Sequence, residues 1–166
     1  MAGPDQDAAR AVALLVGRGQ SLATAESLTG GLLGAAITSV PGASAVYRGG
    51  VIAYATDLKA RLAGVPADLL ARFGPVSPQV AAALASGVRG VAGSDWALAT
   101  TGVAGPEGQD GHAPGEVWLG IAGPDGEPRA VRCDLRGDRA AVRGAAVAAA
   151  LALLVDAVDP PVGTEP

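Results

Sequence analysis

An α/β fold is predicted for this chain, specifically a three-layer α/β/α sandwich around a mixed, mostly parallel sheet of about five or six strands. Three observations predict it. Short apolar segments alternate with segments of helical periodicity through the first hundred residues. The segment 95–101 has an apolar centre over 96–99, which is typical of a central strand covered on both faces. Two further short strands flank a Gly-Pro-Asp-Gly turn and indicate an antiparallel hairpin.

The first two helices and strands follow one another closely. Residues 5–18 are expected to be helical because their apolar side chains recur on one stripe, and glycines follow. A short strand over 21–26 runs directly into a second helix over 29–38, which a Pro-Gly pair ends. A second strand is expected over 46–55, where two adjacent glycines indicate a bulge or a close backbone approach.

Three helices are expected between the second and third strands. Asp57 is expected to cap a short helix over 58–63. Pro66 is expected to begin another short helix that ends at residue 72. Ser77 followed by Pro78 marks a clean helix start, because serine caps the first turn and proline needs no hydrogen-bond partner there.

The last elements follow the apolar third strand. A glycine-rich loop, 102–115, leads from that strand into the hairpin formed by strands 117–122 and 130–135. Asp138 is then expected to open a long apolar helix. Because no linker or internal repeat divides the chain, we expect one domain over residues 1–160 and a flexible tail over 161–166.

Composition narrows the classes of function. The net charge is −4 and the basic residues form no stripe, which argues against a nucleic-acid partner. The acidic N-terminus lacks the basic start of a signal peptide, and the apolar run 145–155 is shorter than the ~20 residues that cross a bilayer. A single cysteine, Cys133, suits a reducing compartment. We therefore expect a cytoplasmic protein that binds no membrane.

The first candidate for chemistry is the junction between the first strand and the second helix. Ser27 lies where backbone N–H groups are unpaired and the positive end of the helix dipole favours an oxyanion or phosphate. Gly30 and Gly31 would let a ligand approach the backbone closely. The same residues are also consistent with Ser27 or Thr29 simply capping the helix.

The second candidate is Lys59, the only lysine in a chain that has eleven arginines. A serine nucleophile needs a base, the only histidine (His112) lies in a polar loop, and guanidinium stays protonated. A lysine that acts as a base must be uncharged, so we expect its amine to be partly buried with a lowered pKa. Tyr54 would orient the amine or relay a proton. A surface lysine and an ordinary sheet tyrosine are the alternatives.

Two further segments are candidates for binding. The loop that starts at Thr101 and Gly102 and includes Gly105 follows a central strand, where ligands bind in open α/β sheets, and its N–H groups suit a phosphate or ribose. Arg139, in the first turn of the last helix, would grip a phosphate or simply be solvated. One cysteine and one histidine do not make a usual zinc site, so we expect no metal.

Taken in order, these segments resemble the CinA C-terminal domain family, the nicotinamide-nucleotide amidases also called PncC. The matching pieces run through most of the chain and occupy residues 24–31, 47–54 with Lys59, 64–65, 74–77, 101–106, 115–118 and 137–139. The resemblance implies an amidohydrolase that converts nicotinamide mononucleotide (NMN) to nicotinate mononucleotide and ammonia, for pyridine-nucleotide salvage.

The resemblance also implies roles for particular residues. Ser27, Lys59 and Tyr54 are expected to be catalytic. The expected substrate-binding residues are Thr29, Gly30, Gly31, Thr101, Gly102, Gly105 and Arg139. No cofactor is implied, the partner is a small-molecule nucleotide, and a homo-oligomer is expected.

The chain departs from the family pattern at Ala113, where a basic residue is common, and at Glu116, where a small or apolar one is. A carboxylate near a phosphate site would repel the substrate. Two alternatives therefore stay open: a catalytically weak nucleotide-binding or assembly module of the same fold, and an amidase for another small carboxamide.

Overall fold

A computed structural model describes residues 4–160 of the chain. The flexible tail expected over 161–166 lies outside the described residues. In chain order the elements are α1 (Pro4–Arg18), β1 (Leu22–Glu26), α2 (Leu32–Thr38), a 3-10 turn (Ala43–Ala45), β2 (Tyr47–Ile52), α3 (Thr56–Ala63), α4 (Ala67–Phe73), α5 (Pro78–Ala92), β3 (Trp96–Gly102), β4 (Glu116–Ala122), β5 (Arg129–Asp134) and α6 (Arg139–Val158).

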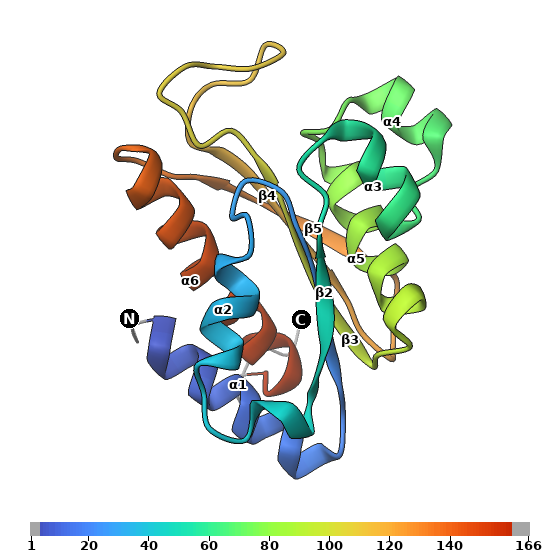
Figure 1. Ribbon diagram of the computed structural model, residues 1–166, viewed down its shortest axis with the longest axis vertical. Helices are drawn as coiled ribbons and strands as arrows, with labels where there is room; N and C mark the ends of the chain where they lie inside the picture. The colour runs from blue at the N-terminus through green and yellow to red at the C-terminus, as the bar shows by residue number, and fades with distance from the viewer. Residues whose placement is uncertain (1–3, 161–166) are drawn as a thin grey trace.

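The five strands form one open sheet between two layers of helices. The strand order is β2-β1-β3-β4-β5. Helices α1, α2 and α6 cover one face, and α3, α4 and α5 lie on the other (Figure 1). The predicted mixed α/β/α fold is therefore confirmed. Parallel pairs are not a majority, however: β1 pairs in parallel with β2 and β3, whereas β3–β4 and β4–β5 are antiparallel. The reason is that no crossover helix follows β3.

Small side chains let α5 lie close to the sheet. The strand residues that face it are mostly alanines, namely Ala23, Ala25, Ala97 and Ala99. At Gly120 of β4, an added Cβ would collide with the carbonyl oxygen of Ala81 in α5. Although aromatic residues are scarce, the core is closely packed, because small side chains let the helix and sheet layers approach one another.

Helix α6 is long and apolar enough to cross a membrane, judged by length and composition alone. The core helix of a soluble protein passes the same test. In this structure α6 packs against α1, α2 and the sheet. Its buried side chains are Val142, Ala146, Val147, Ala150, Leu151, Leu154, Val155 and Val158.

Local sequence signals placed most helix ends correctly. Ser77 caps α5 by accepting a hydrogen bond from the Val80 amide at 3.2 Å, and Asp138 caps α6 through the Ala141 amide at 2.9 Å. The expected cap at Asp57 is wrong: α3 begins at Thr56, two residues earlier than expected, so Asp57 lies inside the helix and pairs with Arg61 across one exposed turn at 3.6 Å. Helix α2 begins at residue 32 rather than 29 because residues 27–30 form a separate turn.

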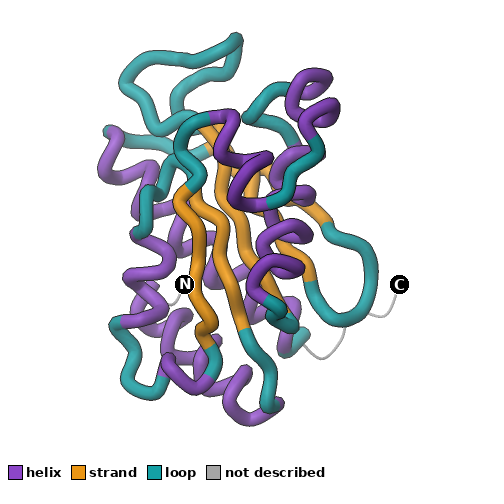
Figure 2. Tube along the Cα trace, turned by 45° about the vertical axis from the view of Figure 1, so that its right-hand side comes forward, coloured by secondary structure: helices purple, strands orange, loops and turns teal. Residues whose placement is uncertain are grey.

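The connections that follow β1 and β2 diverge at one edge of the sheet. Strands β1, β2 and β3 are parallel, so their carboxyl ends lie at the same edge. The chain leaves β1 for one face through α2 and leaves β2 for the other face through α3 (Figure 1). The long loop between β3 and β4 extends past the same strand ends (Figure 2). Ligands bind at such a divergence in open α/β sheets.

Candidate active site

Ser27 and Lys59 meet at this edge of the sheet. Ser27 follows β1 directly, and Lys59 lies in the first turns of α3. The Lys59 Nζ is 3.0 Å from the Ser27 Oγ. Lys59 is only 1% exposed and Ser27 only 8% exposed. The two side chains that the sequence predicted as nucleophile and base are therefore in hydrogen-bond contact and shielded from water.

Two main-chain carbonyls fix the direction of the amine. Lys59 Nζ donates to the carbonyl oxygen of Ala53 at 2.8 Å and to that of Tyr54 at 3.4 Å. Because carbonyls only accept, an uncharged amine that donates its two N–H groups to them directs its lone pair at the third contact, the Ser27 hydroxyl. The same three contacts also satisfy the three N–H groups of the charged form.

Burial increases the fraction of the Lys59 amine that is uncharged near neutral pH. It lowers the pKa of Lys59 from 10.5 to about 8. No carboxylate among residues 4–160 forms an ion pair with Lys59, so no neighbouring negative charge raises the pKa of the amine again. At pH 7 an amine with a pKa of about 8 is roughly one-tenth uncharged, against well under one-thousandth for an exposed lysine.

The single lysine allows this pKa to be measured without interference. Protein labelled with ¹³C at lysine Cε is expected to give one side-chain resonance whose chemical shift titrates with a midpoint near pH 8. In urea the same resonance should titrate near 10.5, because unfolding returns the amine to water. A folded-state midpoint equal to the urea value would contradict the burial of the amine.

A cavity of about 250 Å³ opens beside the pair. Its lining includes the predicted residues Tyr54, Thr101, Gly102, Gly105 and Arg139. Arg139 spans the cavity, since its guanidinium donates to the Gly105 carbonyl and to the Tyr54 hydroxyl, each at 2.8 Å. The Tyr54 phenol thus contacts Arg139, and only the Tyr54 carbonyl contacts the amine. No group of three or more metal-ligating side chains occurs within residues 4–160.

The family model of the CinA C-terminal domain matches residues 5–158. The chain belongs to the CinA C-terminal domain family. A CinA-like protein of Frankia casuarinae is 53% identical over 142 residues, which cover 85% of this chain and 32% of that protein. A CinA-like protein of Parasynechococcus marenigrum is 50% identical over 89% of this chain and 36% of the relative. The chain therefore spans about a third of the curated relatives it matches.

Two solved structures match this chain over nearly all of their own length. The protein from Klebsiella pneumoniae 700603 aligns with a TM-score of 0.90 at 34% identity, covering 95% of this chain and 98% of that one. The competence or damage-inducible protein of Enterobacter asburiae aligns with a TM-score of 0.92 at 32% identity, covering 96% of this chain and 100% of that one.

In this CinA domain the start of α2 is not free to bind a substrate anion. The buried carboxylate of Glu26, the last residue of β1, accepts the amides of Gly31 and Leu33 at 3.0 Å and that of Gly34 at 2.8 Å. It also accepts the hydroxyl of Thr29 at 2.7 Å. Sequence reasoning missed this role, although an acid near a helix N-terminus is a recognised signal.

The expectations for the glycines at this helix start are corrected accordingly. The Gly31 amide donates to Glu26, and the Gly30 amide donates to the Ser27 carbonyl at 3.0 Å. Neither glycine lines the cavity, and Thr29 is fully buried behind it. Neither amide is therefore the free donor that the predicted oxyanion role requires: the Gly31 amide pairs with a carboxylate and the Gly30 amide with a carbonyl.

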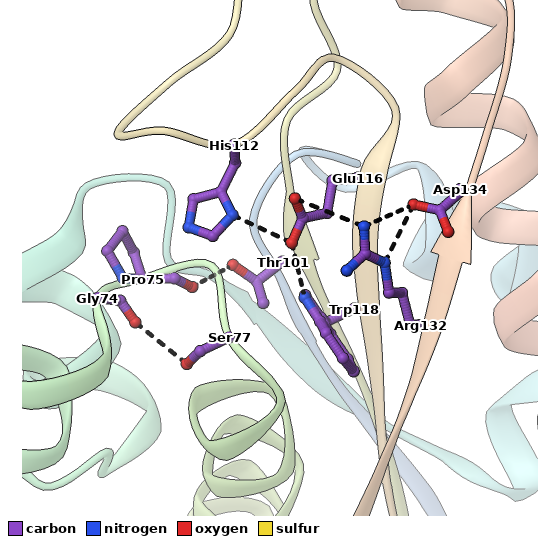
Figure 3. Close-up of polar contacts among 9 residues, drawn as sticks. All are labelled: Gly74, Pro75, Ser77, Thr101, His112, Glu116, Trp118, Arg132 and Asp134. Carbon is purple, nitrogen blue, oxygen red and sulfur yellow. Dashed lines mark hydrogen bonds and ion pairs between the residues drawn. The ribbon is translucent and has the colours of Figure 1, made fainter.

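Figure 3 shows two sets of polar contacts near the site, one at Thr101 and one at Glu116. The Thr101 hydroxyl donates to the Pro75 carbonyl at 2.6 Å and so ties β3 to the segment before α5. In the second set, the Glu116 carboxylate contacts His112 Nδ1 at 3.0 Å and Trp118 Nε1 at 3.2 Å. Thr101 is thus engaged with the protein as well as lining the cavity.

The Glu116 carboxylate, which the sequence placed near a possible phosphate site, is contacted by His112, Trp118 and Arg132. Partial burial works to raise its pKa, but the hydrogen bonds from His112 and Trp118, together with the charge of Arg132, outweigh it and leave the pKa lowered. Glu116 is absent from the cavity lining. His112, which the sequence placed in a polar loop, contacts this carboxylate at 3.0 Å and so links the loop between β3 and β4 to the first residue of β4.

Proposed function

We propose that this CinA domain is an amidohydrolase that converts NMN to nicotinate mononucleotide and ammonia, with Ser27 as nucleophile and Lys59 as base. The observation that carries the proposal is the buried contact of 3.0 Å between Lys59 Nζ and Ser27 Oγ at the wall of a cavity. A serine becomes nucleophilic only when an adjacent base takes its proton, and a desolvated lysine meets that need. The choice of NMN rests on the family resemblance.

The proposed reaction has two stages. Ser27 Oγ attacks the carboxamide carbon while its proton passes to Lys59 Nζ, and the carbonyl electron pair moves onto the oxygen. When this intermediate collapses, the C–N bond breaks and Lys59 returns the proton to the departing nitrogen, which leaves as ammonia. Water then attacks the acyl-enzyme, loses its proton to Lys59, and Ser27 Oγ leaves with that proton. The carbonyls of Ala53 and Tyr54 accept from the amine in both charge states.

Arg139 is the residue proposed to hold the phosphate of the nucleotide. It lines the cavity, and two of its N–H groups bridge Gly105 and Tyr54, which leaves three of its five donors for a ligand. Tyr54, which is 58% exposed, lies at the mouth of the same cavity and would hold this guanidinium in place. The loop from Thr101 to Gly105 would contact the ribose.

Release of ammonia from NMN, followed between pH 6.5 and 9.5, tests the proposal and carries a prediction about pH. Because only the uncharged amine takes a proton, kcat/KM is expected to rise about tenfold per pH unit below the Lys59 pKa of about 8 and to level off above it. Nicotinamide riboside, which lacks the phosphate, is the matched control and should be a poor substrate.

Each result separates the candidate functions. Binding of NMN without ammonia release would favour the nucleotide-binding module. Faster turnover of a different carboxamide would favour an amidase of other specificity. A rate that is flat with pH across the range would contradict the role given to Lys59.

A further inference from the structure

We infer that Arg143 is a positioning residue that holds the turn after Ser27 so that the Leu28 amide faces the oxyanion of the reaction. The inference rests on the proposed amidase function and supplies the oxyanion donor that Gly30 and Gly31 do not provide. It comes from one juxtaposition: a guanidinium from α6 lies against the outer side of the turn that carries the nucleophile.

The guanidinium bridges two successive carbonyls of that turn. Arg143 Nε donates to the Leu28 carbonyl at 2.9 Å, and its Nη2 donates to the Thr29 carbonyl at 3.1 Å. The two contacts join residues 115 and 114 positions apart in the chain. Gly30 allows the approach, since a Cβ at that residue would lie 3.3 Å from Nη2. A planar fork with two donors matches this pair of acceptors, and a lysine would not.

Hydrogen bonds on both sides of Leu28 fix the direction of its amide. A trans peptide is planar, so its N–H points opposite to the carbonyl of the preceding residue. The Ser27 carbonyl accepts the Gly30 amide at 3.0 Å, which sets the direction of the Leu28 N–H. Arg143 fixes the carbonyl at the other end of Leu28. Within residues 4–160 the Leu28 amide donates to no protein acceptor, and Leu28 lines the cavity beside Ser27.

The position of this amide is chemically apt. The N–H of the residue that follows a nucleophilic serine is a recurring oxyanion donor, because it lies next to the carbon under attack. Glu26 secures the opposite end of the turn through the amides of Gly31 and Leu33. A carboxylate on the amide side and a guanidinium on the carbonyl side thus hold the same short turn.

Arg143→Ala, assayed on NMN, tests the inference. We expect kcat to fall about 10²-fold with KM within twofold, because the contact matters when negative charge develops on the substrate oxygen. Free guanidinium ion at millimolar concentration should restore part of the rate to this variant, whereas Arg143→Lys should recover little. Arg10→Ala is the matched control, since Arg10 makes only an exposed ion pair with Asp159 at 3.2 Å.

The thioamide analogue of NMN, used as a second substrate, distinguishes a positioning role of Arg143 from a purely structural one. An oxyanion donor favours oxygen over sulfur, so wild type should turn over NMN much faster than its thioamide analogue. In Arg143→Ala this preference should shrink by the factor that kcat loses. A lower melting temperature with an unchanged oxygen-to-sulfur ratio, or an unchanged kcat, would overturn the inference. Absence of ammonia release from both amides by wild type would instead overturn the proposed function, and this inference with it.

Discussion

Ser27→Ala is expected to lower kcat/KM for ammonia release from NMN by at least about 10³-fold, the scale of loss when a serine hydrolase loses its nucleophile. The hydroxyl is the only group of the described cavity lining that contacts the buried amine through a side chain. Removing one oxygen leaves the Ser27 amide bonded to the Thr100 carbonyl at 3.0 Å, so the turn should keep its shape. Binding of NMN, measured by calorimetry, should therefore change little.

The matched control is Ser39→Ala, which removes an exposed hydroxyl that bonds only to the Ala36 carbonyl at the end of α2. It should leave the rate unchanged. Rapid acid quenching of wild type during turnover, followed by peptide mass analysis, should find the acyl group on the peptide that contains Ser27. An acyl group on another side chain, or full activity of Ser27→Ala, would contradict the assignment of the nucleophile.

Local features of the sequence were sufficient to predict most of the fold. Helix starts at Ser77 and Asp138 could be predicted because a side-chain cap and the helix it satisfies are only three residues apart. The sheet edge of the site followed from chain order, since parallel strands present their carboxyl ends together. The antiparallel pairing of β3 with β4 was harder to predict, because it depends on the path of the long loop that joins them.

The finer features of the site depend on packing between distant segments. Ser27 and Lys59 were predicted as a pair because their chemistry requires contact and no other base was available. The carbonyls that direct the amine carry no side-chain signature, so any residue could have stood at position 53 or 54. Arg143 reaches the Leu28 carbonyl across 115 positions, and no spacing rule indicates such a contact.

The start of α2 shows why the anion site predicted from the sequence differs from the one in the structure. Exposed amides and a helix dipole attract an anion, as the sequence indicated. The chain supplies that anion itself through Glu26, which is 2% exposed. The helix start is therefore occupied by a carboxylate of the protein, and our proposal places the substrate in the cavity between Ser27 and Arg139 instead.

Substitutions at Lys59 give the second large expected effect. Lys59→Arg and Lys59→Met should each lower kcat/KM by about 10³-fold or more, because neither side chain accepts a proton from Ser27 at neutral pH. Arginine keeps the positive charge of Lys59, and methionine keeps its length and burial. Equal losses of kcat/KM in the two variants would therefore show that the effect comes from losing the basic amine. Circular dichroism and thermal unfolding check that each variant is folded. Near-normal turnover by either variant would contradict the assignment of the base.

Lys59→Met should also change how stability depends on pH. The amine has a pKa of about 8 in the folded state and 10.5 as its ordinary value. Between these values the unfolded state binds more protons, so the unfolding free energy of wild type rises with pH from about 8 to 10.5 and is independent of this group below that window. A shift of this size corresponds to ~3 kcal/mol.

Methionine at this position has no proton to lose, so the variant lacks that slope. The difference in unfolding free energy between wild type and Lys59→Met, measured by urea titration at pH 7 and pH 11, is therefore expected to move by ~3 kcal/mol in favour of wild type at the higher pH. Other titrating groups are common to both proteins and cancel in this difference. A difference that stays constant between the two pH values would mean that the amine reaches water in the folded state, and an amine in water would be protonated too fully to activate Ser27.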